Sequence, residues 1–346
     1  MNTPMRAPLP SPWTQPVLLP LPLTLPLMLL LASCGPGVPI VDAGMDTAEM
    51  RDTADDAASD VPLDAYRVRD SGVDGGILCN PLGVTLPTPL VCNGHEALCA
   101  RSYGEVSFPM AHNAMNSEEE RWTLPNQGPR VWNQLELGIR GFMLDTYVDR
   151  GETVLCHGPC ALGRRPFVDV LRDLKLFMDC NPGEVITLIL EAHIDEETTR
   201  VAFEQAELMS YLHMQTTGSQ AWPTLESMIR SGRRLVVFTE SNEAVLAWHH
   251  RAYDFMWDTD YSNRVPGDFT CAELRGSRDH GLFLMNHFLT NPVGSAALAE
   301  MVNHNPLLLS RARQCQSESG FLPNFISLDF VERGDLLETV ETLNGF

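Results

Sequence analysis

The stretch SFPMAHNAM, residues 107–115, runs from an apolar segment into an abrupt polar end. Residues 106–110 have the continuous apolar character of a strand buried on both faces, and His112 and Asn113 follow at once. An isolated histidine after a strand has an ordinary explanation, because a loop can hold it through hydrogen bonds. His112 becomes a functional candidate only if other strands of the same sheet also end in reactive side chains.

Short apolar runs rich in β-branched residues alternate with stretches of helical periodicity from about residue 104 onward. The expected strands are 105–110, 141–147, 154–156, 185–191, 234–239, 252–257, 281–287 and 325–330. The expected helices include 167–178, 201–212, 225–230, 296–302 and 336–343. This α/β alternation predicts a distorted (β/α)8 TIM-type barrel. An open doubly wound sheet is the alternative, but the chain has no glycine fingerprint for a dinucleotide.

A barrel of this type carries its chemistry at the carboxyl ends of its strands. Polar residues stand at these ends throughout the chain: His112, Asn113, Asp145, His157, Glu191, His287 and Asp329. One or two of them could be helix caps or hydrogen-bonded loop groups. The whole set is better explained by a single polar mouth.

Two histidines beside carboxylates suit the cleavage of a phosphodiester. One imidazole can take a proton from an attacking hydroxyl and the other can protonate the leaving oxygen, because imidazole titrates near neutral pH. A carboxylate behind the base would orient its ring. Asn113, Asp145 and Glu191 offer oxygen ligands, which suit Ca²⁺ better than zinc. Such a cation would screen the phosphate charge and acidify the hydroxyl.

Four segments in order give the chain a resemblance to a known family. They are SFPMAHNA, QLELGIRGFMLDTY, VLCHGPC and NPGEVITLILEAH. Their order and spacing resemble the X domain of phosphatidylinositol-specific phospholipase C, in the PLC-like phosphodiesterase superfamily. The overall look is similar to small, secreted, cysteine-rich members, and we expect a bacterial one. The resemblance covers residues 91–195 and resumes at 281–290 and 323–330.

The resemblance implies a role for each catalytic candidate. His112 matches the general base that acts on the inositol 2-hydroxyl, and His157 matches the general acid that protonates the diacylglycerol oxygen. Asp329 matches an aspartate behind the base histidine. The implied activity is that of a phosphoric diester hydrolase or lyase whose first product is a cyclic inositol phosphate.

The resemblance also bears on the cofactor. Asn113, Asp145 and Glu191 match metal-ligand positions of the calcium-dependent enzymes, whereas calcium-independent bacterial members have an arginine at the position of Asp145. We therefore expect bound Ca²⁺. Met143 departs from the calcium-type pattern, which has a carboxylate there, so the expected cation site is weakened.

Two other functions are compatible with the same barrel. The substrate could be another phosphodiester, such as a glycosylphosphatidylinositol anchor or a sphingolipid. Alternatively, the chain could be a non-catalytic, surface-binding lipoprotein, for which Met143 is the one sequence indication. The two histidines and Asp329 argue against that alternative, because a binding module needs no proton relay.

Several further polar residues have less clear roles. His287 either lines the mouth or is a structural polar group, and His193 is expected in the loop after its strand. Residues 249–250 are expected on a solvated helical face. Residues 257–261 either present a substrate-facing aromatic or form a capping turn. Strand alternation places Arg140 away from the mouth.

The first 33 residues have the composition of an export signal. Arg6 precedes an apolar stretch, residues 17–32, whose three prolines argue against a membrane-spanning helix. Leu-Ala-Ser-Cys, which ends at Cys34, resembles the lipobox of bacterial lipoproteins. That resemblance implies cleavage before Cys34 and a lipid on its sulfur, and a plain secreted protein is the alternative. Gly35 favours the outer membrane or the cell surface.

Residues 34–76 are expected to form an acidic, disordered linker. Residues 41–76 hold ten Asp or Glu against three Arg and contain no Trp or Phe, so they cannot bury enough apolar surface to fold. The barrel is expected over residues 77–346. The chain has a net charge of −21, which makes nucleic acid an improbable partner. We expect a monomer that meets a phospholipid substrate at a membrane surface and is held to its own membrane through Cys34.

Eight cysteines remain when Cys34 is set aside, and an even number in an exported chain predicts disulfides. Cys92 with Cys99 and Cys156 with Cys160 are close enough in sequence to pair locally. Pairing of Cys271 with Cys315 and of Cys79 with Cys180 is compatible with the rest, although eight cysteines allow about 105 connectivities.

Overall fold

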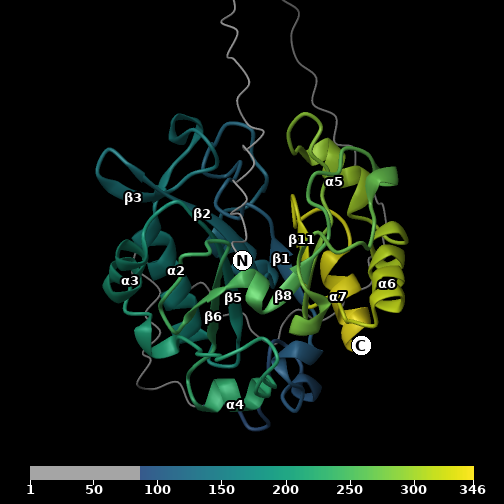
Figure 1. Ribbon diagram of the computed structural model, residues 1–346, viewed down its shortest axis with the longest axis horizontal. Coiled ribbons are helices and arrows are strands. Elements are labelled where there is room, and N and C mark those ends of the chain that lie inside the picture. The colour runs from purple at the N-terminus through teal and green to yellow at the C-terminus, as the bar shows by residue number, and fades with distance from the viewer. Residues whose placement is uncertain (1–85) are drawn as a thin grey trace, which may run out of the picture. The chain divides into compact units, whose positions relative to one another are not determined.

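The fold is a curled, mainly parallel sheet covered by helices, seen here in a computed structural model that describes residues 86–346 (Figure 1). Eight strands run parallel in the order β7-β6-β5-β2-β1-β11-β10-β8. Their bounds are Phe108–Ala111 (β1), Gly141–Asp149 (β2), Ile186–Ala192 (β5), Leu235–Thr239 (β6), His249–Arg251 (β7), Met256–Asp258 (β8), Leu282–Asn286 (β10) and Phe325–Leu328 (β11). The predicted TIM-type barrel is confirmed. It is distorted, because β7 and β8, the first and last of these parallel strands, do not pair with each other, and β8 pairs instead with a short antiparallel strand, β9 (Arg275–Gly276).

The prediction that residues 154–156 form a barrel strand is wrong. Residues 154–156 fall at the end of β3 (Glu152–Leu155), which pairs antiparallel with β2 and then with β4 (Arg165–Pro166), so β3 extends a hairpin outside the barrel. Its place in the barrel is taken by β7. Residues 249–250 were expected on a solvated helical face, but they lie in β7 with exposures of 1% and 4%. Both histidines keep a partner for Nδ1 inside the fold: His249 contacts Glu196 and His250 contacts the Val237 carbonyl.

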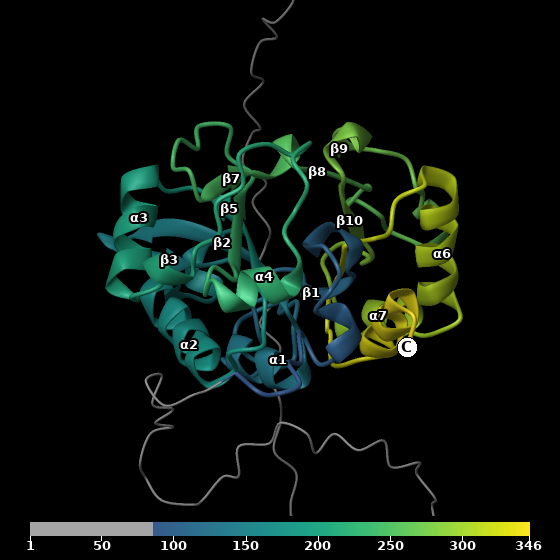
Figure 2. The same cartoon turned by 90° about the horizontal axis from the view of Figure 1, so that it is seen from below.

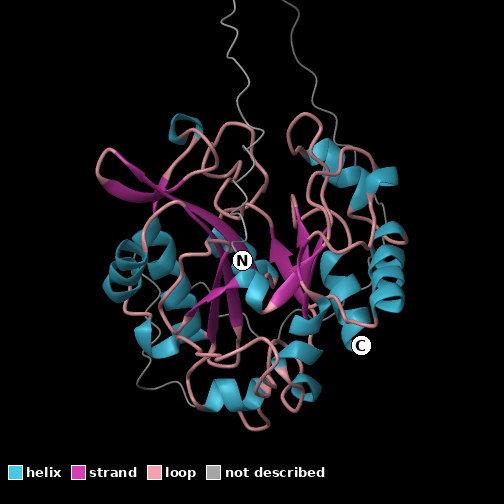
Figure 3. Ribbon diagram, in the orientation of Figure 1, coloured by secondary structure: helices cyan, strands magenta, loops and turns pink. Residues whose placement is uncertain are grey.

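Helices surround the sheet (Figures 2 and 3). They are α1 (Val131–Leu137), α2 (Phe167–Cys180), α3 (Glu196–Gln205), α4 (Leu225–Arg230), α5 (Ala296–Val302), α6 (Leu307–Ser319) and α7 (Leu336–Asn344). Short 3₁₀ helices are η1 (Glu96–Leu98), η2 (Tyr103–Glu105), η3 (Cys160–Leu162), η4 (Met209–Tyr211), η5 (Ala252–Asp254), η6 (Pro266–Asp268) and η7 (Arg278–His280). The helix expected over 201–212 ends at Gln205, because Glu207 has a positive φ of 58°. None of the helices in the described residues is long and apolar enough to cross a membrane.

Strand alternation separates an inner core from an outer one. Phe108, Met110 and Phe325 belong to a buried cluster inside the barrel. Ile326, the residue after Phe325, belongs with Phe142 to a second cluster packed under the helices. Successive side chains of a strand point to opposite faces. Toward the carboxyl ends of the strands, beyond the last apolar layer, the inward-facing side chains become polar. The inward-facing positions at the carboxyl ends are His112, Asp145, Glu191, Glu240, Asp258 and Asp329.

A partly buried ion cluster links the end of β6 to the end of β8. Arg275, on the short strand β9 (Arg275–Gly276), contacts Asp258 through Nη2 at 2.6 Å and Glu240 through Nη1 at 3.0 Å. Glu240 follows β6 and Asp258 ends β8, so the guanidinium spans the place where the barrel is open. The rings of Tyr253 and Tyr261 each lie 4.5 Å from the guanidinium carbon. This cluster links the two sides of the opening between β7 and β8.

Loss of the central cation should therefore destabilise the barrel. We expect Arg275→Gln to lower the free energy of unfolding by about 3 kcal/mol at pH 7, because it leaves the fully buried Asp258 without its counter-ion. Arg251→Gln is the matched control, since its ion pair with Asp254 is about half exposed and should contribute at most about 1 kcal/mol. Urea unfolding measures both variants. Equal losses would contradict the assignment of Arg275 as the bridge.

Three predicted disulfides are confirmed: Cys92–Cys99, Cys156–Cys160 and Cys271–Cys315. The predicted pair of Cys79 with Cys180 stays a prediction, because Cys79 lies outside the described residues. The same is true of the expected export signal (1–33), of lipidation at Cys34 and of the acidic linker (34–76).

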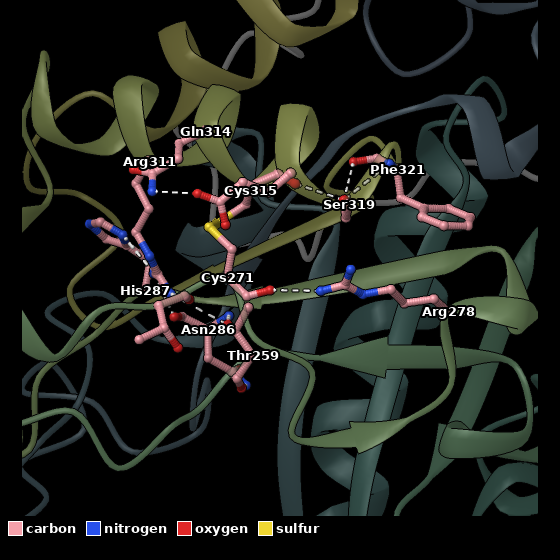
Figure 4. The surroundings of a disulfide bond; sticks show 12 residues. Thr259, Cys271, Arg278, Asn286, His287, Arg311, Gln314, Cys315, Ser319 and Phe321 are labelled. Atoms are coloured by element: carbon pink, nitrogen blue, oxygen red, sulfur yellow. Dashed lines mark hydrogen bonds between the residues drawn. A yellow bond between two sulfur atoms is a disulfide. The ribbon is translucent and has the colours of Figure 1, made fainter.

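The Cys271–Cys315 disulfide ties the loop after β8 to α6, next to a buried arginine (Figure 4). Arg311 donates to the Asn286 carbonyl at 2.7 Å and to His287 Nδ1 at 3.0 Å. His287 Nε2 in turn contacts the Val302 carbonyl at 2.8 Å, and burial lowers the pKa of His287 to about 3. His287 is therefore a neutral structural group between β10 and α6, and it does not line the mouth.

Candidate active site

The first pair in the mouth joins His112 to Asp329. Ala111 is in register with Leu328 in the parallel pairing of β1 and β11, so the next residue of each strand is brought to the same edge. His112 Nδ1 lies 2.8 Å from Asp329 Oδ1, and Asp329 is only 3% exposed. A buried carboxylate on Nδ1 favours the tautomer whose Nε2 has a free lone pair. The His112 ring stacks on Phe288 at 3.8 Å, which fixes its plane.

The second pair joins His157 to Asp145. The β2–β3 hairpin folds back so that Thr146 is in register with Leu155, and Cys156 N donates to the Asp145 carbonyl at 3.3 Å. His157 Nδ1 then lies 2.9 Å from Asp145 Oδ2. Sequence reasoning placed His157 at the end of a barrel strand, but the hairpin carries it to the mouth from outside the barrel.

The charges of the first pair also influence the ionisation of the second pair. The hydrogen bond to Asp145 raises the pKa of His157, and the carboxylates of Glu191 and Asp329 add smaller increases. Burial raises the pKa of Asp145, against the opposing influence of His157 and, more weakly, of His112. His157 is about half exposed at the surface of the mouth, whereas both aspartates are buried. The site thus holds two histidines, each backed by its own carboxylate.

The three predicted metal ligands lie near one another but have other partners. Asp145 is in register with Glu191 across β2 and β5, so both side chains face the mouth. However, Asp145 contacts His157, Glu191 contacts His193 at 2.9 Å, and Asn113 Nδ2 contacts Asn126 at 3.4 Å. No group of three or more His, Cys, Asp or Glu that could hold a metal ion is found within residues 86–346.

The residue two positions before Asp145 explains why the site offers few metal-binding oxygens. Met143 occupies that inward position, and its sulfur accepts a hydrogen bond from Ser327 Oγ at 3.2 Å. Ca²⁺ takes about six to eight oxygen ligands, of which this chain offers two carboxylates and one amide. These residues alone do not fit a closed calcium site, and bound calcium stays a prediction.

Other residues considered from the sequence have clear places. Arg140 pairs with Glu184 at 2.7 Å at the amino end of β2, so its expected position away from the mouth is confirmed. His193 follows β5, as expected, and stacks on Tyr147 at 4.2 Å. Trp257 is fully buried against Phe283 and cannot contact a substrate.

Sequence reasoning missed the residues that fix the first pair. Gln127 Nε2 donates to the His112 carbonyl at 2.6 Å and to the Leu328 carbonyl at 3.0 Å, which ties the ends of β1 and β11 together. Asn126 Nδ2 lies 3.1 Å from both carboxylate oxygens of Asp329. Both residues come from the loop after β1, whose sequence has no pattern that signals such contacts.

Comparison with known proteins agrees with this geometry. A family model described as PI-PLC X 1 matches residues 98–344. The match spans more than half of the chain, so the protein belongs to the PI-PLC X family. A PI-PLC X domain-containing protein of Arabidopsis thaliana is 28% identical over 308 residues, covering 78% of this chain and 70% of its own. PI-PLC X domain-containing protein 1 of Arthroderma benhamiae is 29% identical over 298 residues, covering 78% and 96%.

An uncharacterized secreted protein of Arthroderma benhamiae is 25% identical over 271 residues, covering 71% of this chain and 61% of its own. These sequence relatives are plant and fungal, so the narrower expectation of a bacterial member is not supported.

Solved structures show the same fold. The phosphatidylinositol-specific phospholipase C of Listeria monocytogenes has a TM-score of 0.51 at 16% identity, covering 72% of this chain and 96% of its own. A variant of the Staphylococcus aureus enzyme has a TM-score of 0.50 at 12% identity, covering 72% and 95%. At these identities the likeness establishes the shared fold.

The Asp145 carboxylate should favour the protonated form of His157. We expect Asp145→Asn to lower the pKa of His157, because the hydrogen-bonded negative charge that raises it is lost. NMR titration of the ring signals, assigned with His157→Gln, measures this without any substrate. Asp149→Asn, on the same strand and paired with Arg164, is the control and should leave the pKa unchanged. A His157 pKa that is the same in Asp145→Asn would refute the pairing.

Proposed function

We propose that this protein is a phosphodiesterase of the phosphatidylinositol phospholipase C type that cleaves an inositol phospholipid. The observation that carries the proposal is the pair of separate histidine–carboxylate dyads in one mouth. Two histidines with different partners can serve as base and acid in one displacement, each contributing about 10²–10⁴-fold. The family membership and the shared fold agree with this class of reaction.

The proposed reaction begins at His112. Its Nε2 takes the proton from the inositol 2-hydroxyl while that oxygen bonds to phosphorus. The bond from phosphorus to the diacylglycerol oxygen breaks, and His157 donates its proton to that oxygen. The products are a cyclic inositol phosphate and diacylglycerol, and each histidine ends in the protonation state in which the other began. Asp329 stabilises the imidazolium formed on His112, and Asp145 keeps His157 protonated before the step.

The proposal includes a bound divalent cation, but the two proton transfers are assigned to the histidines alone. Asn113, Asp145 and Glu191 are the residues that would hold Ca²⁺, with the remaining ligands coming from substrate and water. Bound there, it would offset phosphate charge and acidify the attacking hydroxyl.

We also propose that the protein acts outside the cytoplasm. Three disulfides and similarity to a protein named as secreted support export. Lipid attachment at Cys34 would hold the chain at its own cell envelope or surface, where a monomer could reach phospholipid.

The two histidines should respond differently to the leaving group. We expect His112→Ala and His157→Ala each to lower kcat by at least about 100-fold on phosphatidylinositol, because each removes one proton transfer. On an inositol phosphodiester with a nitrophenolate leaving group, His157→Ala should recover most of its activity, since that group departs without a proton. His112→Ala should not recover. His95→Ala is the control, because the His95 ring pairs with Glu341 and contacts neither dyad.

An unchanged rate in both variants would contradict the assignment of the two histidines as base and acid. It would favour a protein that binds without catalysis. Activity on sphingomyelin or on glycosylphosphatidylinositol anchors, without activity on phosphatidylinositol, would move the substrate to another phosphodiester.

Met143 stands where the calcium-type pattern has a carboxylate, and this difference should limit the affinity for Ca²⁺. We expect EGTA to lower activity and Met143→Glu to reduce the calcium concentration needed for half-maximal binding, because it restores an inward carboxylate beside Asp145. Calorimetry with Ca²⁺ measures binding independently of turnover, and Met143→Gln, of the same size without the charge, is the control. Equal calcium affinity in the wild type and in both variants would exclude a cation at these residues.

A further inference from the structure

We propose that Asn126 is a positioning residue for the catalytic base: it holds in place the Asp329 carboxylate that orients His112. This rests on the proposed function for its chemical meaning, and on three features of the structure for its geometry. Asn126 lies in the loop between β1 and α1, is 6% exposed, and does not reach the open mouth. It acts through Asp329.

The first feature is the symmetry of the contact. Asn126 Nδ2 lies 3.1 Å from Asp329 Oδ1 and 3.1 Å from Oδ2. One nitrogen that contacts both oxygens restricts the movement of the carboxylate from that side. Oδ1 also accepts from His112 Nδ1 at 2.8 Å. The orientation of the imidazole therefore depends on the carboxylate that Asn126 holds.

The second feature is that the amide of Asn126 is itself held from behind. Its Oδ1 accepts from Asn116 Nδ2 at 2.7 Å and faces Asn113 Nδ2 at 3.4 Å. These two donors require oxygen on their side, so they place the nitrogen of the amide toward Asp329. Its backbone is also fixed, because its carbonyl accepts from Phe330 N at 2.7 Å. A chain of amides thus leads from the loop to the carboxylate.

The third feature is the lack of space for water around the contact. Gly294 packs so closely that an added Cβ would lie 2.4 Å from Asp329 Oδ2 and 2.8 Å from Asn126 Nδ2. Hydrogen bonds are electrostatically stronger where water is excluded, and a buried carboxylate that loses its donor pays the full cost of desolvation. Asp329 has no other side-chain donor in the described residues than His112 and Asn126.

Asn126→Ala tests the role. We expect kcat to fall by about 10–100-fold with KM little changed, because a freed carboxylate lets the base leave its reactive orientation. We also expect the downfield resonance of the His112 Nδ1 proton, bonded to the buried carboxylate, to shift or broaden. Asn126→Asp should be no better, since it places a second carboxylate against Asp329.

Asn303→Ala is the matched control. Asn303 is also a buried asparagine that donates to Asp329, but to its backbone carbonyl, at 2.8 Å. It should lose stability without changing the His112 resonance. If Asn126→Ala does not fold, Gly294→Ala is the second variant: it keeps Asn126 but crowds both its amide nitrogen and the Asp329 carboxylate, so it should disturb the same His112 resonance.

The inference is overturned if folded Asn126→Ala keeps both the wild-type resonance and a kcat within about threefold of wild type. This outcome is distinct from failure of the proposed function. A wild-type protein without turnover would remove the reaction, but the resonance of His112 would still show whether Asn126 positions the pair.

Discussion

The pairing of β1 with both β11 and β2 is the constraint on which the site depends. It places Ala111 beside Leu328, more than two hundred residues away in sequence, and beside Phe142 on the other side. Because the inward positions of these strands continue past the apolar core, His112, Asp329 and Asp145 arrive at the same edge. The chemistry is thus set by strand register, and any change that slips β1 by one residue would turn His112 out of the mouth.

The two histidine–carboxylate pairs reach this edge by different routes. The first is formed between two neighbouring parallel strands, and its carboxylate is buried and held by an amide side chain. The second is formed across a hairpin that leaves the barrel, and its histidine is half exposed. This difference suits the proposed division of labour. The base needs a fixed orientation beside the reacting hydroxyl, whereas the acid must meet a leaving group that carries a bulky lipid.

The sequence predicted much of this arrangement because strand ends are marked by an abrupt change from apolar to polar residues. That signal located His112, Asp145, Glu191 and Asp329 and the barrel itself. It failed where burial did not follow hydrophobicity, as with His249 and His250 in β7, and where a strand belonged to a hairpin, as with β3. It also could not find Asn126, whose role arises from a loop folding back over Asp329. Such contacts depend on tertiary packing and leave no periodic pattern.

The most direct test of the central claim follows the phosphorus atom. Full-length protein is incubated with phosphatidylinositol vesicles, and the water-soluble products are resolved by ³¹P NMR, with His112→Ala in parallel. Two histidine dyads acting as base and acid predict that a five-membered cyclic inositol phosphate appears first, and that it is absent with His112→Ala. Formation of an acyclic inositol phosphate as the first product, or of the cyclic product at the same rate in the variant, would contradict the account.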